Sequence, residues 1–351
     1  MYKYPKWIVF QVTETCNLKC KMCYEWGENG FYHQKKNLNT LDIKIIQEVI
    51  KQSKEYQPYF ELFGGEPLLY SHLEEVLKEI HMANCKVDIP TNGTLLEEKA
   101  DLLVKYPPRR IWVSIDGPEK FNDSQRGKSV FQKASKGIEK LHAEKIKNGS
   151  HYPEIGVTMV VTPDNYTSIE ELFIKELNAE FFDWFSIEFE LYITQDVYDT
   201  YAKFMKDKFD VHKELSAKGL IRKCDIFKDI DLDILMRQIR NVKEYALKND
   251  IKVIGYPKII EKENLQHFYS AEWNLMKEKK NRCTLPWIYV EISANGDVTP
   301  CHTFYDYSIG NVYEKSLYDI WNGDRAAYFR KEIREGMLPI CIACSRYYSD
   351  I

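Results

Sequence analysis

Short apolar segments alternate with amphipathic segments along the first 195 residues. The apolar segments have the length of buried strands, and most are separated by a helical pattern of apolar residues. The expected strands are 7–12, 59–63, 86–90, 111–115, 155–161 and 185–189, and the expected helices are 40–56, 72–84, 96–105, 130–147 and 168–178. This alternation predicts an α/β fold with βαβ units around a parallel sheet. Such a chain can form a partial (β/α)6 barrel or an open sheet, with functional groups at the carboxyl ends of the strands.

The rest of the chain comprises two segments with different sequence patterns. Residues 196–280 are expected to form a mainly helical connector, with helices over 197–219, 226–249 and 261–280 and a short strand at 251–254. Residues 281–351 return to short strands and turns. There Asn295-Gly296 separates two apolar runs, which is typical of the tight turn of a β-hairpin, and a helix is expected over 316–333. We therefore predict three parts: 1–195, 196–280 and 281–351.

The overall composition excludes several classes of protein. Of the 351 residues, 44% are hydrophobic and 29% are charged, which excludes a disordered or fibrous chain. No run of about 18 uncharged apolar residues occurs, so no spanning helix is expected, and the first residues lack the pattern of a secretory signal. The net charge of −4 gives no indication of nucleic-acid binding. We expect a cytoplasmic protein with neither nucleic acid nor membrane among its partners.

Nine cysteines are many for a cytosolic chain, where they are more often ligands or reactive thiols than disulfides. The first cluster, Cys16, Cys20 and Cys23, has the spacing C-x3-C-x2-C and follows the first expected strand. Both a structural zinc ion and an iron–sulfur cube normally take four protein ligands. Three thiolates would therefore leave one iron with an open position, or would form a zinc site completed by a distant ligand.

The second cluster comprises four cysteines in two pairs. Cys283 and Cys301 lie at the two ends of the expected hairpin, and Cys341 and Cys344 follow the last expected helix. Four thiolates can complete one tetrahedral sulfur site, for which zinc and an iron–sulfur cluster are both chemically allowed. Two further cysteines, Cys85 and Cys224, stand alone.

The first cluster and the strand ends that follow it resemble the radical S-adenosylmethionine (SAM) family over nearly the whole chain. Besides the three-cysteine loop, the matching motifs are Gly64-Gly65-Glu66-Pro67, Thr91-Asn92-Gly93-Thr94, Ser114-Ile115-Asp116-Gly117-Pro118 and Arg126-Gly127. The resemblance implies a [4Fe–4S] cluster on Cys16, Cys20 and Cys23, with SAM bound at its open iron. It also implies reductive cleavage of SAM to a 5′-deoxyadenosyl radical, which abstracts hydrogen from carbon. SAM contacts are implied for Tyr24, Gly64, Gly65, Glu66, Pro67, Asn92, Ser114, Asp116 and Arg126, whereas Met22 departs from the aromatic residue that is frequent in the family.

The C-terminal segment resembles the SPASM/twitch extension of radical SAM enzymes. The resemblance rests on residues 283–301, Ile309-Gly310-Asn311-Val312, Asp319-Ile320-Trp321-Asn322 and the pair Cys341 and Cys344. It implies an auxiliary [4Fe–4S] cluster on Cys283, Cys301, Cys341 and Cys344. No cysteine follows Cys344, so we expect a single auxiliary cluster in a small twitch-like domain. Ligation by four protein thiolates favours electron transfer or structural support over substrate binding.

The resemblance implies an enzyme of the oxidoreductase or maturase type, supplied with electrons by a flavodoxin or ferredoxin. SPASM-bearing relatives most often modify peptides, and twitch-bearing relatives also act on small molecules such as sugars and aminocyclitols. We expect peptide modification, with oxidation, epimerisation or rearrangement of a small molecule as the alternative. A non-enzymatic iron–sulfur or zinc protein is the alternative from another class, and the open-iron loop argues against it.

Two further expectations concern the substrate. The chain begins a few residues before its first strand, so we expect no leader-recognition domain, and a peptide substrate would need a separate carrier or direct docking. Cys224 belongs to neither cluster. Cys224 can be an ordinary thiol without a function in the reaction. Alternatively, it can be a hydrogen-atom donor to a substrate radical.

Overall fold

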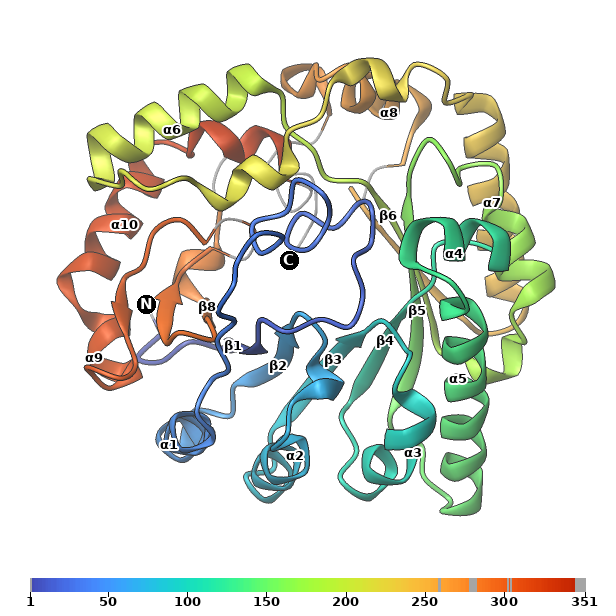
Figure 1. The fold of residues 1–351 in the computed structure, drawn as a ribbon, viewed down its shortest axis with the longest axis horizontal. Coiled ribbons are helices and arrows are strands. Elements are labelled where there is room, and N and C mark those ends of the chain that lie inside the picture. The colour runs from blue at the N-terminus through green and yellow to red at the C-terminus, as the bar shows by residue number, and fades with distance from the viewer. Residues whose placement is uncertain (1, 258–259, 278–282, 302, 304, 345–351) are drawn as a thin grey trace.

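The computed structural model describes residues 2–257, 260–277, 283–301, 303 and 305–344. Its centre is one curved sheet with the strand order β10-β9-β8-β1-β2-β3-β4-β5-β6-β7 (Figure 1). Strands β8 and β1 to β7 are parallel to one another, whereas β9 is antiparallel to β8 and to β10. The α/β fold with a parallel sheet, predicted from the alternation of segments, is confirmed.

The six expected strands of the first part are all present. They are β1 (Trp7–Thr13), β2 (Tyr59–Gly64), β3 (Lys86–Thr91), β4 (Arg110–Ser114), β5 (Glu154–Val161) and β6 (Trp184–Phe189). Helices α1 (Ile43–Ser53), α2 (Leu73–Met82), α3 (Leu96–Lys105) and α5 (Val130–Lys147) lie outside the curve of the sheet, and α4 (Glu119–Arg126) follows β4 (Figure 1). The expected helix at 168–178 is a π-helical segment, Glu171–Glu176.

The alternation of side chains along each strand separates the core from the interior of the barrel. In β2, Phe60 and Leu62 are fully buried in the main hydrophobic core, whereas Tyr59, Glu61 and Phe63 are only partly buried and line a cavity. Successive residues of a strand point to opposite faces of its sheet. The outer face of the sheet therefore packs against the helices, and the inner face carries polar and aromatic groups.

The expected connector adds a strand to the sheet. It contains α6 (Gln195–Phe209), α7 (Leu232–Lys248), β7 (Lys252–Tyr256) and α8 (Lys262–Tyr269), and β7 pairs with β6 as a further parallel strand. Helix α6 is shorter than expected because Asp210 adopts a left-handed conformation (φ 55°) that ends it. The helix expected at 261–280 is shorter than predicted and ends at Tyr269, and residues 278–280 of that range lie outside the described residues.

The C-terminal segment also joins the same sheet. The expected hairpin is confirmed: β8 (Tyr289–Ile292) and β9 (Asp297–Thr299) are antiparallel, and Gly296 has the positive φ of 87° that the turn requires. β8 pairs with β1, and a short β10 (Gly310–Asn311) pairs with β9. The sheet thus contains strands from all three expected parts. The division of the chain into three separate domains stays a prediction.

One expected helix is divided in two. The segment 316–333 forms α9 (Leu317–Asn322) and α10 (Asp324–Glu335), because Gly323 between them is extended (φ −79°, ψ 171°). Among the described residues, no helix has the length and apolar composition that a membrane span requires.

Candidate functional site

A cavity of about 750 Å³ lies within the curve of the sheet. Its lining includes the three cysteines of the first cluster, residues at the ends of β2, β3 and β4, and side chains from the inner face of the sheet. Eight of the nine residues expected to contact SAM line it: Tyr24, Gly64, Gly65, Glu66, Pro67, Asn92, Ser114 and Arg126. The structure therefore gathers motifs that are far apart in the sequence around one space.

The three cysteines of the first cluster lie in the loop that follows β1. The backbone amide of Leu18 donates to Cys16 Sγ (3.4 Å), that of Trp26 donates to Cys23 Sγ (3.3 Å), and Arg126 Nη1 lies 3.9 Å from Cys20 Sγ. Donors of this kind stabilise sulfur ligands that carry negative charge. Burial raises the pKa of Cys16 to about 12 and that of Cys23 to about 11. A positively charged iron–sulfur group would reverse this preference and hold the thiolates.

Within the described part of the chain, no three His, Cys, Asp or Glu side chains meet as closely as a single metal ion requires. A cubane holds its thiolates further apart than one zinc ion does. The chemistry of the donor set, sulfur alone in both cysteine clusters, is the one that iron–sulfur groups take.

Glu66 joins the ends of two neighbouring strands. Its side chain is buried, and it accepts hydrogen bonds from Thr91 Oγ1 (2.7 Å) and from the backbone amides of Leu68 (3.0 Å) and Asn92 (2.8 Å). Burial raises the pKa of Glu66, and these hydrogen bonds oppose that effect. The carboxylate thus holds the rim of the cavity in place.

Asn92 connects this rim to the cysteine loop. Its Nδ2 donates to Asn17 Oδ1 (2.8 Å), and Asn17 Nδ2 donates to Thr94 Oγ1 (2.8 Å). Sequence analysis did not select Asn17, because its only local signal is its position beside Cys16. Its hydrogen-bond partner Asn92 lies 75 residues away in the chain.

Gly64 and Gly65 have a packing role in addition to the SAM contact that the resemblance implies. Both residues line the cavity, and their contact with SAM stays a prediction. A Cβ on Gly64, however, would lie 2.2 Å from the carbonyl oxygen of Thr13, and a Cβ on Gly65 would lie 2.3 Å from that of Thr15. The two glycines therefore let the end of β2 pack against the start of the cysteine loop.

Asp116 is the one expected SAM contact that does not line the cavity. Its Oδ2 lies 2.6 Å from Arg126 Nε, its Oδ1 accepts from the backbone amide of Val160 (2.9 Å), and its side chain is fully buried. Burial disfavours the charge of Arg126, but the Asp116 carboxylate outweighs this effect and raises the pKa of Arg126 above its ordinary value. The structure places Asp116 behind Arg126, where it positions the guanidinium at the cavity.

Tyr24 connects the first cysteine loop to the C-terminal segment. Its hydroxyl lies 2.6 Å from the hydroxyl of Tyr305, and both rings line the cavity. Sequence analysis missed Tyr305, which lies four residues beyond Cys301 but outside any quoted motif. The contact brings the segment after Cys301 to the edge of the candidate active site.

The four cysteines of the second cluster come together from three segments. Cys283 precedes β8, Cys301 follows β9, and Cys341 and Cys344 lie at a short 3-10 turn, Pro339–Ala343. Burial raises the pKa of Cys341 well above its ordinary value, and the neighbouring thiols of Cys301, Cys344 and Cys283 raise it further. The structure thus places all four thiols within electrostatic reach of one another.

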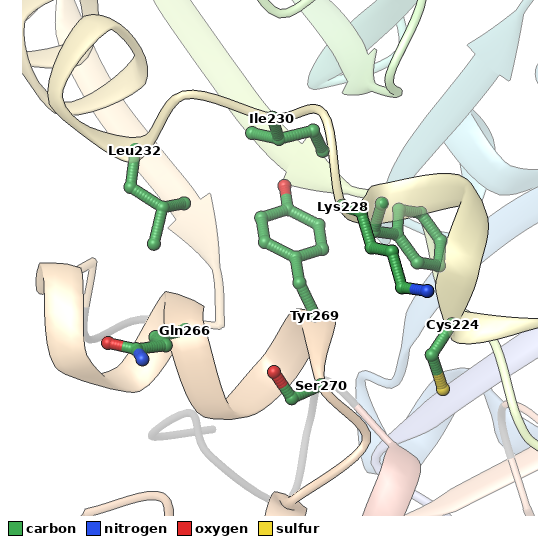
Figure 2. A pocket seen from close by; sticks show the side chains of 8 residues that line it. Cys224, Lys228, Ile230, Leu232, Gln266, Tyr269 and Ser270 are labelled. Atoms are coloured by element: carbon green, nitrogen blue, oxygen red, sulfur yellow. The ribbon is translucent and has the colours of Figure 1, made fainter.

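Cys224 lies at a different cavity. It begins a 3-10 turn, Cys224–Phe227, and lines a pocket of about 360 Å³. Figure 2 shows Cys224 across this pocket from Leu232 and Gln266, with Tyr269 and Ser270 between them. Cys224 is not among the residues that line the larger cavity. Its role as hydrogen-atom donor stays a prediction without support from this placement.

Comparison with known proteins agrees with this geometry. A family model for the radical SAM superfamily matches residues 10–174, and a model for SPASM, an iron–sulfur cluster-binding domain, matches residues 283–345. The tungsten-containing aldehyde ferredoxin oxidoreductase cofactor-modifying protein of Pyrococcus furiosus is 25% identical over 97% of this chain and 87% of its own length. The serine-type anaerobic sulfatase-maturating enzyme of Bacteroides thetaiotaomicron is 26% identical over 96% of this chain and 79% of its own.

Solved structures show the same fold. SuiB of Streptococcus suis bound to S-adenosylmethionine has a TM-score of 0.63 and 19% identity, over 99% of this chain and 77% of SuiB. The complex of SuiB with its precursor peptide SuiA has a TM-score of 0.61 and 19% identity, over 92% and 66% of the two chains. The two family matches, over residues 10–174 and 283–345, show that the chain belongs to the radical SAM superfamily, as an enzyme that uses a [4Fe–4S] cluster and SAM and carries an iron–sulfur cluster-binding SPASM domain at its C-terminal end.

Proposed function

We propose that the enzyme modifies a peptide by abstracting a hydrogen atom from one of its carbon atoms. The observation that carries this proposal is the continuity of the large cavity. One space of about 750 Å³ extends from the three-cysteine loop to the inner face of the sheet. This volume lies in the upper part of the range for ligand sites, about 300–1,000 Å³. It offers room for SAM together with the reacting part of a substrate.

The residues at the cavity have separable roles in this proposal. When bound, the cluster would supply the electron that cleaves SAM, and this cleavage would give a 5′-deoxyadenosyl radical. Cys16, Cys20 and Cys23 would hold the cluster, and Arg126 presents a positive charge beside Cys20. Aromatic side chains such as Trp26 and Tyr305 line the cavity and would limit access of water to the reacting atoms.

The four cysteines of the C-terminal cluster would hold one auxiliary [4Fe–4S] cluster. Four protein thiolates would leave no iron open, which suits electron transfer. The contact between Tyr24 and Tyr305 joins the two cysteine regions. We propose a flavodoxin or ferredoxin as the external electron donor, and direct docking or a separate carrier for the peptide.

Two relatives support a peptide substrate, and one supports the alternative. SuiB is solved with a precursor peptide, and the relative from B. thetaiotaomicron is named as a sulfatase-maturating enzyme. The relative from P. furiosus is named as a cofactor-modifying protein and is similar along nearly the whole chain. Modification of a small molecule is therefore the second candidate function.

The experiment separates an anaerobic extract of the source organism into a peptide-sized and a small-molecule fraction. Each is added to the reconstituted enzyme with SAM and reductant, and 5′-deoxyadenosine is quantified. We expect the peptide fraction to accelerate its formation and to contain a peptide of altered mass. Acceleration by the small-molecule fraction alone would replace the proposal with the second candidate.

A further inference from the structure

Thr303 lies between the large cavity and the second cysteine cluster. It lines the cavity, and its Oγ1 lies 3.5 Å from Cys344 Sγ, a distance at which a hydroxyl and a sulfur atom still share a hydrogen bond. Tyr305, two residues further along the chain, lines the same cavity. One side chain thus contacts a sulfur atom of the second cluster and, at the same time, the space proposed for the substrate.

The backbone that follows Thr303 is held in place by two contacts. The hydroxyl of Tyr305 lies 2.6 Å from that of Tyr24, and the two rings are stacked with their centroids 6.4 Å apart. Asp306 is buried and accepts a hydrogen bond from the backbone amide of Ser216 (2.6 Å). A side chain on a segment that is already ordered loses little further freedom when it forms a hydrogen bond. The fold therefore holds the Thr303 hydroxyl beside Cys344.

The state of Cys344 decides which atom of this pair is the donor. In the chain without a bound cluster, either Thr303 Oγ1 or Cys344 Sγ could donate. A cysteine that ligates iron is a thiolate and carries no hydrogen. In the loaded protein the hydroxyl of Thr303 is therefore the donor, and Cys344 Sγ is the acceptor.

A donor at a ligand sulfur favours the reduced form of an iron–sulfur cluster. Reduction adds one negative charge, and a hydrogen bond to a ligand sulfur stabilises this charge. The reduction potential is therefore higher with the donor than without it. The first cluster has a comparable arrangement, since Arg126 Nη1 lies 3.9 Å from Cys20 Sγ and Arg126 also lines the cavity.

We propose that Thr303 is a positioning residue that donates a hydrogen bond to Cys344 and raises the reduction potential of the auxiliary cluster. This inference rests on the proposed function, because it takes the four C-terminal cysteines as the ligands of that cluster. A higher potential suits a cluster that accepts electrons. Thr303 exerts this effect from the side of the second cluster that faces the cavity.

The test uses the full chain with only the second site loaded. Cys16, Cys20 and Cys23 are replaced by alanine, and this parent chain is reconstituted anaerobically, so that the iron it holds belongs to the C-terminal cysteines. Its reduction potential is measured by reductive titration followed by electron paramagnetic resonance. We expect Thr303→Val, which has a similar shape but no hydroxyl, to bind about four irons and to have a lower potential than the parent chain. Thr303→Ser keeps a hydroxyl and should restore the parent potential.

Thr158→Val is the matched control. Thr158 also lines the cavity, but it lies on β5, which is separated from β8 by β1 to β4 in the sheet. Its substitution removes a hydroxyl from the same cavity at a distance from the second cluster. We expect the potential of the auxiliary cluster in this variant to equal that of the parent chain.

Two outcomes would overturn the inference. One is a potential in Thr303→Val equal to that of the parent chain, and the other is an equal fall in Thr303→Val and Thr303→Ser, which would assign the effect to packing. If the valine variant loses its iron, Thr303→Ala is the second variant without a hydroxyl, and the same results are required of it. A parent chain that holds no iron would count against the four-cysteine site and so against the proposed function. A parent chain with about four irons and unchanged potentials overturns the role of Thr303 alone.

Discussion

The ion pair between Arg126 and Asp116 shows how one buried residue positions another. The two side chains are 9% and 0% exposed, and removal of one partner from a buried pair typically costs about 3–5 kcal/mol. We expect Asp116→Asn to lower the free energy of unfolding by about 3 kcal/mol and to weaken SAM binding. Equilibrium unfolding and SAM titration check both effects. The exposed Glu119→Gln on α4 is the control, and an Asp116→Asn protein with wild-type stability would contradict this role.

Glu291 makes a pH-dependent contribution to stability. Burial raises its pKa well above 4.5, so the unfolded chain releases this proton at a lower pH than the folded chain does. The contribution of Glu291 to wild-type stability therefore falls as the pH rises from about 4.5 towards the folded pKa. Glu291→Gln is neutral throughout and should gain stability relative to the wild type over this range. Urea unfolding at several pH values measures the difference, and parallel stability curves for the two proteins would contradict it.

The site residues that the sequence predicts are those whose function only a few residue types can perform. The seven cysteines, Glu66 and Arg126 carry local spacing or motif signals, and the structure places each at one of the two sites. Asn17 and Tyr305 carry no such signal. Their contacts depend on which strands become neighbours, and strand order is not encoded in a short window of sequence.

Gly65 lies where the end of β2 packs closely against the cysteine loop, and this packing leaves no room for a side chain. A Cβ on Gly65 would lie 2.3 Å from the carbonyl oxygen of Thr15 and 2.8 Å from the amide of Cys16, so the loop would have to move. We expect Gly65→Ala to lower the iron content from about eight to about four per chain, because only the first site is displaced. Gly336→Ala, which meets no atom within 4 Å, is the control. Full iron content in Gly65→Ala would show that the loop tolerates the shift.

The alternation of strands and helices was predictable because buried parallel strands and their covering helices have distinct apolar patterns. The point at which α6 ends and the division between α9 and α10 were not. These depend on single residues, Asp210 and Gly323, whose backbone conformations decide where a helix stops.

At the scale of the whole molecule, the C-terminal segment completes the sheet that carries the active site. β1 lies between β2 and β8, so a chain that ends at residue 280 would leave one edge of β1 unpaired. Exposed strand edges promote aggregation. We expect this truncated chain to aggregate and to lose amide-exchange protection in β1, measured by hydrogen–deuterium exchange. A soluble truncated chain with native protection of β1 would show that the first part folds alone.

We expect Cys16, Cys20 and Cys23 to hold a cluster that cleaves SAM, and the C-terminal cysteines to hold a second cluster. The most direct measurement is anaerobic reconstitution, followed by iron analysis and quantification of 5′-deoxyadenosine after addition of SAM and reductant. We predict about eight irons per chain and formation of 5′-deoxyadenosine, with Cys16→Ala losing the product and about half of the iron. Unchanged product formation by Cys16→Ala, or a wild type that binds only about four irons, would contradict the account.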